Sequence, residues 1–326
     1  MTRLLTRGDV AALLTLDECI AAVEQAFALQ AEGKALGPGV LALHAASGGF
    51  HVKAAGLPLG RFYVAAKVNA NFPDNPARGL PTIQGVVVLS DGETGQLLAL
   101  IDSMEITALR TGAATAVAAR YLARPDARVA TIVGCGRQGR IQLAALTRVR
   151  KLERVYAVDR DATISREFAD RMSAELGVDV RPVAALAEAA RQSDLWVTCT
   201  PSRSPLLRRE DVAPGAFVAA VGADSEHKQE LDPGLLAAAS VVVDSLEQSA
   251  AIGDLHHALR AGAMSLTDVH AELAEVVVGH KPGRRSPEDI VVFDSTGVAI
   301  EDVAAAALVY EKAIGAAQGV EVELGT

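Results

Sequence analysis

The sequence predicts an α/β protein in which a domain with a doubly wound parallel sheet is inserted into a second, α+β domain. Beyond residue 129, short apolar runs alternate with helical or turn-rich segments, as in a parallel sheet with right-handed crossovers. Between about residues 40 and 101, short β runs are separated by turn sequences such as SDGETG, which favours antiparallel pairing. A last helical segment can return to the first domain, so we interpret the parallel sheet as an insertion.

Length and composition indicate a globular protein with two domains. The chain has 326 residues, about twice the length of a ~150-residue domain. Half of the residues are hydrophobic and 22% are charged, which excludes a disordered chain. The formal charge of -9, without a tract rich in Lys or Arg, argues against a nucleic-acid partner.

Cysteine usage and the amino terminus indicate the compartment. Cys19, Cys135 and Cys199 lie far apart in apolar surroundings and share no spacing typical of a disulfide or a metal site, which favours a reducing cytoplasm. The opening MTRLLTRGDVAALL lacks the apolar core of a signal peptide, and no run of ~20 apolar residues is available to span a bilayer. We expect a cytoplasmic protein with no membrane partner.

The first part of the chain predicts a helix, a sheet and a second helix. Thr15 and Glu18 have the spacing of a capping box, and an amphipathic helix follows over residues 15–34. Asp102 and Glu105 form a similar pair before a helix that ends near Pro125. Between the two helices, the predicted strands are FYVAAKVNA, IQGVVVLS and QLLALID.

The second part alternates strand, turn and helix. The buried strand RVATIV enters the glycine turn GCGRQG, the helix IQLAALTRVR follows, and RVYAVDRD is the second strand. Later strands are predicted at LWVTCT, FVAAVGA, SVVVDS and IVVFDS, and the final helix at AIEDVAAAALVYEKAIGAAQ. We therefore expect a first domain over residues 1–118, completed by 298–326, and an inserted domain over residues 119–297.

The glycine turn is the sharpest local motif. Gly134 permits a tight turn, Gly136 lets the backbone approach a pyrophosphate, and Gly139 lets helix and strand pack closely. The helix then opens with Arg137 and Gln138, where free N–H groups attract phosphate. A glycine-rich turn alone is common, but this one follows an apolar strand and precedes a helix. That context predicts a Rossmann dinucleotide site.

Asp159 indicates which dinucleotide is bound. It ends the second strand, 20 residues after Gly139, where a carboxylate accepts hydrogen bonds from the ribose hydroxyls. It would also repel a 2'-phosphate, which favours NAD. Arg160 keeps NADP open, because its guanidinium group is able to reach such a phosphate.

Two cations in apolar surroundings form a candidate substrate site. The alternation of RFYVAAKVNANF places Lys67 on a face of small residues, and Arg110 lies in the weakly charged helix SMEITALRTGAA. Together they suit a carboxylate, with the Thr82 hydroxyl as a further donor. The alternative is an ordinary pair of salt-bridged or snorkelling side chains.

An ordered set of motifs connects these residues to a known family. The run from KVNANFPDNPARGLPTIQG to MEITALRTGAATAVAARYLAR, followed by VGCGRQG, VGADSEHKQELDP and DSTGVAIEDVAAA, resembles the ornithine cyclodeaminase/mu-crystallin family over residues 50–315. The resemblance implies a homodimer. Its first domain would carry the dimer interface and much of the substrate site, and its second domain would be the Rossmann unit.

The resemblance also implies roles for individual residues. Lys67, Thr82 and Arg110 would hold a substrate carboxylate, with Lys67 counted as catalytic, and Asp224 would be the acid/base beside the reacting carbon. Reduction of an imine needs a proton at nitrogen, which fits a carboxyl group. Without the resemblance, an Asp at the end of a strand is more often a helix cap or a turn residue. The expected coenzyme-binding residues also include Thr111 and Thr200.

The chain departs from the family pattern in one segment. Where many members carry an arginine before the second strand, GPGVLALHAASGGFHVKAAGL has none, and Lys53 stands where others often have methionine. Lys53 is therefore a candidate for the missing positive charge, and the HVK run resembles the imino-acid reductases of the family. The alternative is a surface lysine on an edge strand.

Other polar residues carry less information. His256 and His257 are adjacent and lack a further ligand at metal spacing, so we expect no metal site. Ser295, Thr296 and Gly297 would touch the nicotinamide by resemblance, although such turns before helices are common. No arrangement typical of a serine or cysteine nucleophile is present in the sequence.

The resulting expectation is an NAD(P)H-dependent reductase of a small α-imino acid, such as Δ1-pyrroline-2-carboxylate or a related ketimine. The alternatives are an ornithine cyclodeaminase, an acyclic amino acid dehydrogenase of the alanine dehydrogenase kind, and a nucleotide-binding protein without turnover, as mu-crystallin exemplifies.

Overall fold

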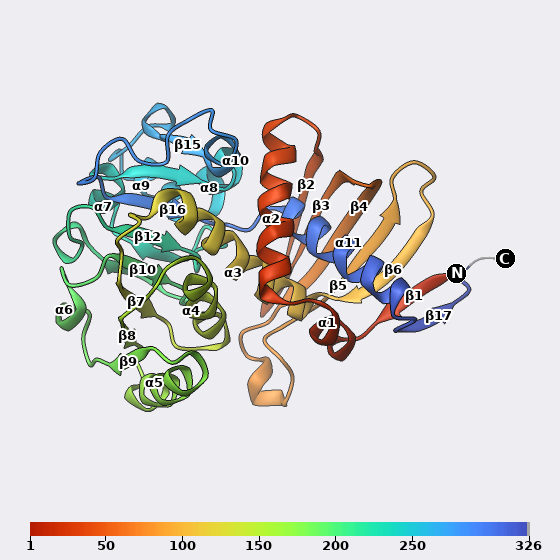
Figure 1. The fold of residues 1–326 in the computed structure, drawn as a ribbon, viewed down its shortest axis with the longest axis horizontal. Helices are drawn as coiled ribbons and strands as arrows, with labels where there is room; N and C mark the ends of the chain where they lie inside the picture. Colours follow the sequence, from red (N-terminus) through yellow and green to blue (C-terminus); the bar gives the residue numbers. More distant parts are fainter. Residues whose placement is uncertain (325–326) are drawn as a thin grey trace. The chain divides into compact units, whose positions relative to one another are not determined.

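The computed structural model describes residues 1–324, and the chain divides into two compact units (Figure 1). The first unit runs from Met1 to Arg110 and is completed by the segment from Val298 on, and the second is Thr111–Gly297. The division falls inside helix α3 (Ser103–Leu122), as does the boundary at residue 118 that the sequence suggested. The predicted fold class is confirmed: a domain with a parallel, doubly wound sheet is inserted into an α+β domain.

The first unit is built on a seven-stranded sheet in the order β17-β1-β6-β5-β4-β3-β2. Strands β1 and β6 are parallel and the other neighbours are antiparallel, so the prediction of a mainly antiparallel sheet is confirmed. The strands are β1 (Thr2–Leu5), β2 (Leu36–Ala45), β3 (Gly48–Leu59), β4 (Arg61–Asn71), β5 (Ile83–Asp91), β6 (Leu97–Asp102) and β17 (Val320–Val322).

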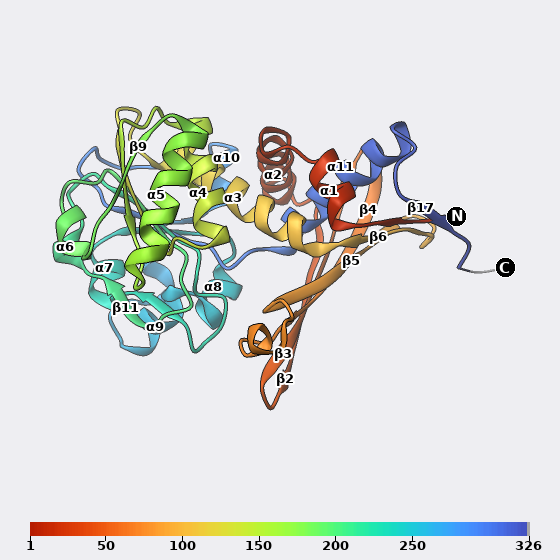
Figure 2. The same ribbon diagram turned by 90° about the horizontal axis from the view of Figure 1, so that it is seen from below.

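Helices cover one face of this sheet, as Figure 2 shows. They are α1 (Arg7–Leu13), α2 (Leu16–Ala31) and α11 (Ala299–Gly315), and a short 3-10 helix spans Asn75–Arg78. The predicted capping box of α2 is present, because Thr15 and Glu18 bond each other's backbone N–H groups. The apolar stripe of α2 is buried with α11, which packs on β3 and β4. The last helix therefore returns to the first unit.

The alternation predicted for β4 decides which of its side chains are buried. Tyr63, Ala65 and Lys67 are each less than 5% exposed, whereas the residues between them are half-buried. The hairpin of β2 and β3 had no strands predicted by name. Strand β3 lies between β2 and β4, so the interpretation of Lys53 as an edge-strand residue is wrong.

The second unit contains an eight-stranded, all-parallel sheet in the order β15-β14-β16-β12-β10-β7-β8-β9. All six predicted strands are present, and the strands of this sheet that were not predicted are the short edge strands β9 and β15. The strands are β7 (Val129–Val133), β8 (Arg154–Val158), β9 (Asp179–Pro182), β10 (Leu195–Thr198), β12 (Phe217–Ala220), β14 (Ser240–Val243), β15 (Ala271–Glu272) and β16 (Val291–Asp294).

Helices and a small second sheet complete this unit. The helices are α4 (Arg137–Val149), α5 (Ala162–Leu176), α6 (Leu186–Ala189), α7 (Pro233–Ala237), α8 (Leu246–Ile252), α9 (Asp254–Arg260) and α10 (Leu273–Val277), with 3-10 turns at Arg209–Asp211 and Leu266–Asp268. Strands β11 (Arg203–Leu207) and β13 (Gln229–Leu231) pair with each other.

The strand order of the parallel sheet indicates where a ligand binds. From β7 the chain proceeds to β8 and β9 on one side, and it then crosses to β10 and β12 on the other. The order therefore reverses between β7 and β10, and in doubly wound sheets ligands bind outside the carboxyl ends of the strands at such a point.

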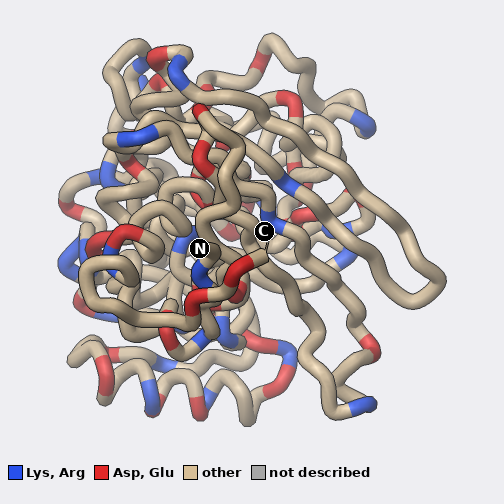
Figure 3. The backbone as a smooth tube through the Cα atoms, turned by 90° about the vertical axis from the view of Figure 1, so that its right-hand side faces the viewer, with Lys and Arg blue, Asp and Glu red and all other residues tan. Residues whose placement is uncertain are grey.

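Charge and hydropathy add two observations. Lys and Arg positions are interspersed with Asp and Glu positions along the backbone (Figure 3). Among residues 1–324, no helix is both long and apolar enough to cross a membrane.

Candidate functional site

The glycine loop follows β7 at the point where the strand order reverses. Gly134 has a φ of 102°, which only glycine adopts without strain, and a Cβ atom there would lie 2.9 Å from the Cys199 carbonyl oxygen. A Cβ atom on Gly139 would collide with the carbonyl oxygen of Gly134. Both positions therefore require glycine.

Gly136 differs from its two neighbours because the space beside it is open. No atom lies within 4 Å of a Cβ atom built there, and the residue is exposed. Gly136 is also the N-cap of α4, and no side chain caps this end of the helix. Arg137 and Gln138 form its first turn. An uncapped helix start beside exposed backbone is the environment that a pyrophosphate prefers, so the loop fits a dinucleotide.

Asp159 lies against the glycine loop, at the end of β8. Its Oδ2 accepts the N–H of Cys135 at 2.9 Å and its Oδ1 accepts the N–H of Asp161 at 3.1 Å. The following residue, Arg160, is exposed. The structure thus brings the predicted ribose ligand and the predicted phosphate loop together, and it leaves a guanidinium group one residue away.

Thr200 follows β10 and lies beside the glycine loop. Its methyl group is 3.0 Å from the Cβ position of Gly134, and its N–H and hydroxyl donate to the carboxylate of Glu230 at 2.6 and 2.7 Å. Sequence reasoning missed Glu230, which is fully buried. Thr111 directly follows Arg110 in α3.

Asp224 lies beyond the carboxyl end of β12, in the second unit. Its Oδ1 is 2.6 Å from the ammonium group of Lys228, and 46% of its side chain is exposed. The segment bends tightly here, because the N–H of Asp224 donates to the carbonyl of Gly222 at 3.2 Å. Asp224 therefore lies at the carboxyl edge of the sheet, the edge at which ligands of doubly wound sheets bind.

The two predicted cations of the first unit are buried and share acidic partners. The ammonium group of Lys67 lies 2.7 and 2.8 Å from the two oxygens of Asp302. Arg110 contacts Glu301 at 2.8 Å through Nη1 and Asp302 at 3.2 Å through Nε. All four side chains are at most 7% exposed. Lys67 on a strand and Arg110 on a helix therefore meet across the start of α11.

Burial has opposite effects on the two ends of this cluster. Burial, together with the positive charges of Arg110 and Lys53, lowers the pKa of Lys67 to about 8, while Asp302 opposes the shift. Burial by itself raises the pKa of Asp302, but the neighbouring Lys67 and Arg110 outweigh it and leave this pKa below the ordinary value. Lys67 therefore titrates within the range where enzymes work.

Lys53 stands directly opposite Lys67 in the register of β3 and β4, so the two side chains share one face. Positive charge is therefore concentrated on this face, although the two ammonium groups repel each other. Thr82 lies just before β5, where its carbonyl accepts the N–H of Phe72 at 2.8 Å. Within residues 1–324, the Thr82 hydroxyl accepts no hydrogen bond from Lys67 or Arg110, which donate to Asp302 and Glu301.

Sequence reasoning missed Glu301 and Asp302, the acids that hold the cations. They are 0% and 1% exposed and lie in the first turn of α11, a position where acidic residues are usual helix caps. The sequence did contain a signal. Two adjacent acids stand at the start of an otherwise apolar helix, and a helix that is buried buries such acids with it.

The less informative polar residues have structural partners. His256 and His257 each bond a backbone carbonyl, of Ala250 at 3.0 Å and of Lys228 at 2.8 Å. Among residues 1–324, no group of three or more His, Cys, Asp or Glu side chains is arranged to hold a metal. The residues Ser295, Thr296 and Gly297 surround the buried carboxylate of Asp244.

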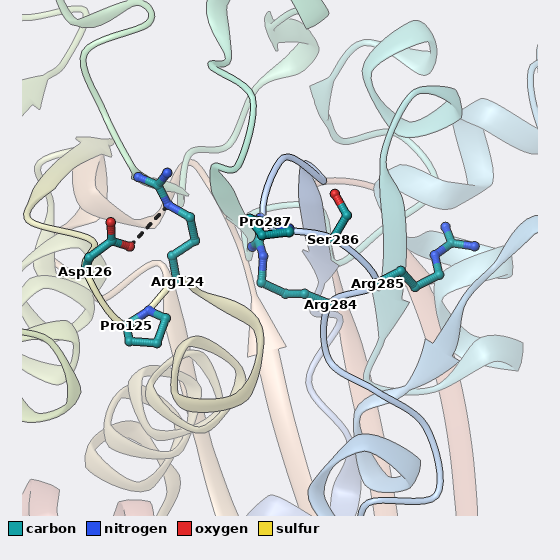
Figure 4. A pocket seen from close by; sticks show the side chains of 7 residues that line it. All are labelled: Arg124, Pro125, Asp126, Arg284, Arg285, Ser286 and Pro287. Atoms are coloured by element: carbon teal, nitrogen blue, oxygen red, sulfur yellow. Dashed lines mark ion pairs between the residues drawn. The ribbon is translucent and has the colours of Figure 1, made fainter.

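A pocket of about 400 Å³ in the second unit lies away from these residues (Figure 4). It is formed by residues 124–126 and 284–287, which precede β7 and β16 and so mark the amino end of the sheet. Two of its arginines bond to other parts of the same unit. Arg124 contacts Asp194 at 2.7 Å, and Arg284 donates to the carbonyls of Leu122 and Gly215. The glycine loop lies at the opposite, carboxyl end of the sheet.

Comparisons with known proteins agree with the geometry. The sequence model of the ornithine cyclodeaminase/mu-crystallin family matches residues 1–317. The chain belongs to this family. Its predicted resemblance is thereby confirmed, and the match covers both units and the helix α11 that carries Glu301 and Asp302.

Several members of the family are similar over most of their length. An alanine dehydrogenase from Archaeoglobus fulgidus is 42% identical over 96% of this chain and 95% of its own. An iminosuccinate reductase from Paracoccus denitrificans is 36% identical over 96% and 98%. A Δ1-pyrroline-2-carboxylate reductase from Bacillus cereus is 36% identical over 79% of each chain.

Two solved structures have the same fold. An archaeal alanine dehydrogenase dimer with bound NAD has a TM-score of 0.96, with 41% identity over 99% of each chain. The Δ1-pyrroline-2-carboxylate reductase of Thermococcus litoralis, in complex with NADH and L-proline, has a TM-score of 0.95, with 35% identity over 98% of this chain and 100% of its own.

Proposed function

We propose that this protein reduces the C=N bond of a small α-imino acid with NAD(P)H and forms the L-amino acid. The proposed substrate is Δ1-pyrroline-2-carboxylate or a closely related ketimine. The observation that carries the proposal is the buried cluster of Lys67 and Arg110, held by Asp302 and Glu301. Buried cations fixed in this way suit the planar carboxylate of an imino acid. Relatives named for this reductase activity support the choice of substrate.

In the proposed reaction, Lys67 and Arg110 bind the substrate carboxylate, with Thr82 and Lys53 as further donors. When bound, the reduced coenzyme supplies the hydride that adds to the imine carbon. The C=N bond becomes a single bond as its electron pair moves to nitrogen, and Asp224 supplies the proton that the nitrogen takes up. The adjacent Lys228 stabilises the carboxylate that remains.

The proposed coenzyme site is the loop of Gly134, Gly136 and Gly139 with the first turn of α4. Asp159 binds the ribose hydroxyls, and Thr111 and Thr200 complete the set. We propose NAD as the preferred coenzyme, and complexes of related structures with NAD and NADH support this choice.

A second candidate is an acyclic amino acid dehydrogenase. The alanine dehydrogenase from Archaeoglobus fulgidus, at 42% identity, favours it. The proposed carboxylate ligands serve an acyclic imine as well as a cyclic one, since both carry the same carboxylate next to the C=N bond.

The deciding experiment measures oxidation of NADH and NADPH with a panel of imino acids. The panel contains Δ1-pyrroline-2-carboxylate, its six-membered homologue, and pyruvate or oxaloacetate with ammonia. L-Ornithine is incubated with NAD in parallel, and its products are identified by mass. Fastest oxidation with the cyclic imines supports the proposal. Preference for the acyclic mixtures establishes the second candidate, and proline formed from ornithine without net NADH consumption indicates a cyclodeaminase.

We expect Asp159→Asn to shift coenzyme preference toward NADPH, raising the ratio of kcat/KM for NADPH to that for NADH by on the order of tenfold. The substitution removes the negative charge that repels a 2'-phosphate, but it keeps an oxygen that can accept the N–H of Cys135. Kinetics with both coenzymes measure the ratio. Asp161→Asn is the matched control, since asparagine also serves as an N-cap. An unchanged ratio in Asp159→Asn would rule out the assigned role.

We propose that the protein is a homodimer, in which a second copy covers the sheet face opposite the helices of the first unit. Leu41, Leu43 and Phe50 are 53%, 53% and 40% exposed. In the register of the sheet, Leu41 stands opposite Val52 and Leu43 opposite Phe50, so these side chains share a face that the unit's helices leave bare (Figure 2). An exposed apolar patch on a long edge strand favours association, and a related structure is a dimer.

We expect the wild-type chain to have the mass of two copies in light scattering and the double variant Leu41→Lys/Leu43→Lys to be monomeric. Four buried ammonium groups in a two-fold interface would carry a large desolvation cost. Leu266→Lys, which changes a leucine of the second unit that is 50% exposed, is the control and should stay dimeric. A double variant that keeps the wild-type mass would place the interface elsewhere.

A further inference from the structure

Glu230 is a buried carboxylate that the proposed reaction does not yet use. It lies in the short strand β13 and is 0% exposed. Among residues 1–324, no Lys, Arg or His forms an ion pair with it. Burial raises its pKa, and hydrogen bonds from Thr200 and Gly222 act in the opposite direction. Burying a carboxyl group without a cation destabilises a fold unless its oxygens are well hydrogen-bonded, so its bonds reveal its role.

The carboxylate of Glu230 joins two loops at the carboxyl edge of the parallel sheet. Its Oε1 accepts the N–H and hydroxyl of Thr200, just after β10, and its Oε2 accepts the N–H of Gly222, just after β12, at 2.9 Å. The backbone comes so close that a Cβ atom on Gly222 would lie 2.5 Å from Cδ of Glu230. Gly222 is two residues before Asp224, and the two are joined by a hydrogen bond.

The backbone of Glu230 is itself fixed by hydrogen bonds to a second buried carboxylate. Its N–H and that of Leu231 donate to Oδ1 of Asp254 at 2.8 and 2.9 Å. The N–H groups of Asp254 and Leu255 donate in turn to the carboxylate of Asp294 at 3.2 and 2.9 Å. Both aspartates are 0% exposed. A chain of carboxylate-to-amide bonds therefore runs from the end of β16 to the loop that carries Asp224.

We propose that Glu230 is a positioning residue for Asp224. Its carboxylate fixes the backbone at Gly222 and thereby places the Asp224 carboxyl group where it delivers its proton. This inference rests on the proposed role of Asp224 in the reductase. Glu230 touches neither substrate nor coenzyme in this account. Because it also bonds Thr200 of the proposed coenzyme site, the test separates an effect that passes through Asp224 from one that does not.

The test is a double-mutant cycle of Glu230→Gln and Asp224→Asn, with single-turnover rates measured under saturating NADH and imino acid. Glutamine has one acceptor oxygen instead of two, so it loses a bond to Thr200 or Gly222. We expect Glu230→Gln alone to slow turnover by on the order of 10²-fold, as for a misplaced catalytic group. In the Asp224→Asn background, the same change should have no further effect. Glu226→Gln, an exposed carboxylate in the same loop, is the control and should behave as wild type.

Each result separates the inference from the proposed function. A rate loss from Glu230→Gln that is equally large with and without Asp224→Asn overturns the positioning role and leaves the reductase proposal intact. Full turnover of Asp224→Asn overturns the role of Asp224 itself, and with it this inference. Hydrogen exchange at the amides of Thr200 and Gly222 should be faster in Glu230→Gln. If that variant does not fold, Glu230→Asp enters the same cycle under the same criterion, because it keeps the charge but shortens the reach.

Discussion

Asp224→Asn should lower turnover of the imino acid by on the order of 10²- to 10⁴-fold, the usual contribution of a positioned proton donor. The amide is nearly isosteric with the carboxyl group, and its oxygen can still accept a hydrogen bond from Lys228, which lies 2.6 Å from Oδ1. The local fold should therefore remain, while the proton for the substrate nitrogen is lost. Coenzyme binding should change little, since the loop of Gly134, Gly136 and Gly139 is not altered.

Two measurements separate these effects. Steady-state kinetics give kcat and KM for the imino acid, and quenching of Trp196 fluorescence by NADH gives the coenzyme dissociation constant. The expected result is a low kcat with an unchanged dissociation constant. Lys228→Met provides a graded comparison, because Asp224 loses its charged neighbour but keeps its carboxyl group, so turnover should fall less than in Asp224→Asn. Wild-type kcat in Asp224→Asn would leave the reaction without its proposed acid.

The glycine loop could be predicted from the sequence because its conformational constraints are local. A positive φ at Gly134 and the close approach of Gly139 to its own turn leave a signature within six adjacent residues. The parallel strands were predictable for a similar reason, since a short apolar run between two helices rarely forms anything other than a buried strand. The edge strands β9 and β15 lack that signal, because they are short and carry charged residues.

The partners of the buried cations were not predictable, because they depend on tertiary structure. Asp302 is separated from Lys67 by 235 residues, and Glu301 from Arg110 by 191. Alternation in β4 predicted a buried ammonium group, and physical chemistry required an anion near it. It did not specify whether the protein or a substrate supplies that anion. In the structure the protein supplies one from the start of α11, and the remaining positive charge of Lys53 lies on the same face.

The proposed role of Lys67 in binding the substrate carboxylate predicts that activity depends on the protonation of this lysine. Its pKa is lowered to about 8, mainly by burial, so the ammonium form prevails below this pH and the neutral amine above it. Only the ammonium form attracts a carboxylate. We therefore expect kcat/KM for the imino acid, which reports the free enzyme, to fall as pH rises above about 8.

Variants at Lys67 and Asp302 should move this decline in defined directions. Lys67→Arg keeps the charge at all accessible pH values, so the decline due to Lys67 should disappear. Asp302→Asn removes the carboxylate that raises the pKa of Lys67, so the decline should begin at lower pH. Lys67→Met should reduce kcat/KM by on the order of 10- to 100-fold at neutral pH, the value of a hydrogen bond to a charged group.

The measurement is a pH profile of kcat/KM for wild type and the three variants with one substrate. Titration of the substrate imine affects all four proteins equally, so differences between the profiles belong to the enzyme. Lys34→Met is the matched control, since this lysine of the same unit is 58% exposed and pairs with Glu32 at the surface. If Lys67→Arg keeps the wild-type decline, another group causes it, and the carboxylate is bound without Lys67. If the decline disappears in Lys67→Arg and shifts to lower pH in Asp302→Asn, the acid of α11 sets the protonation of the lysine of β4.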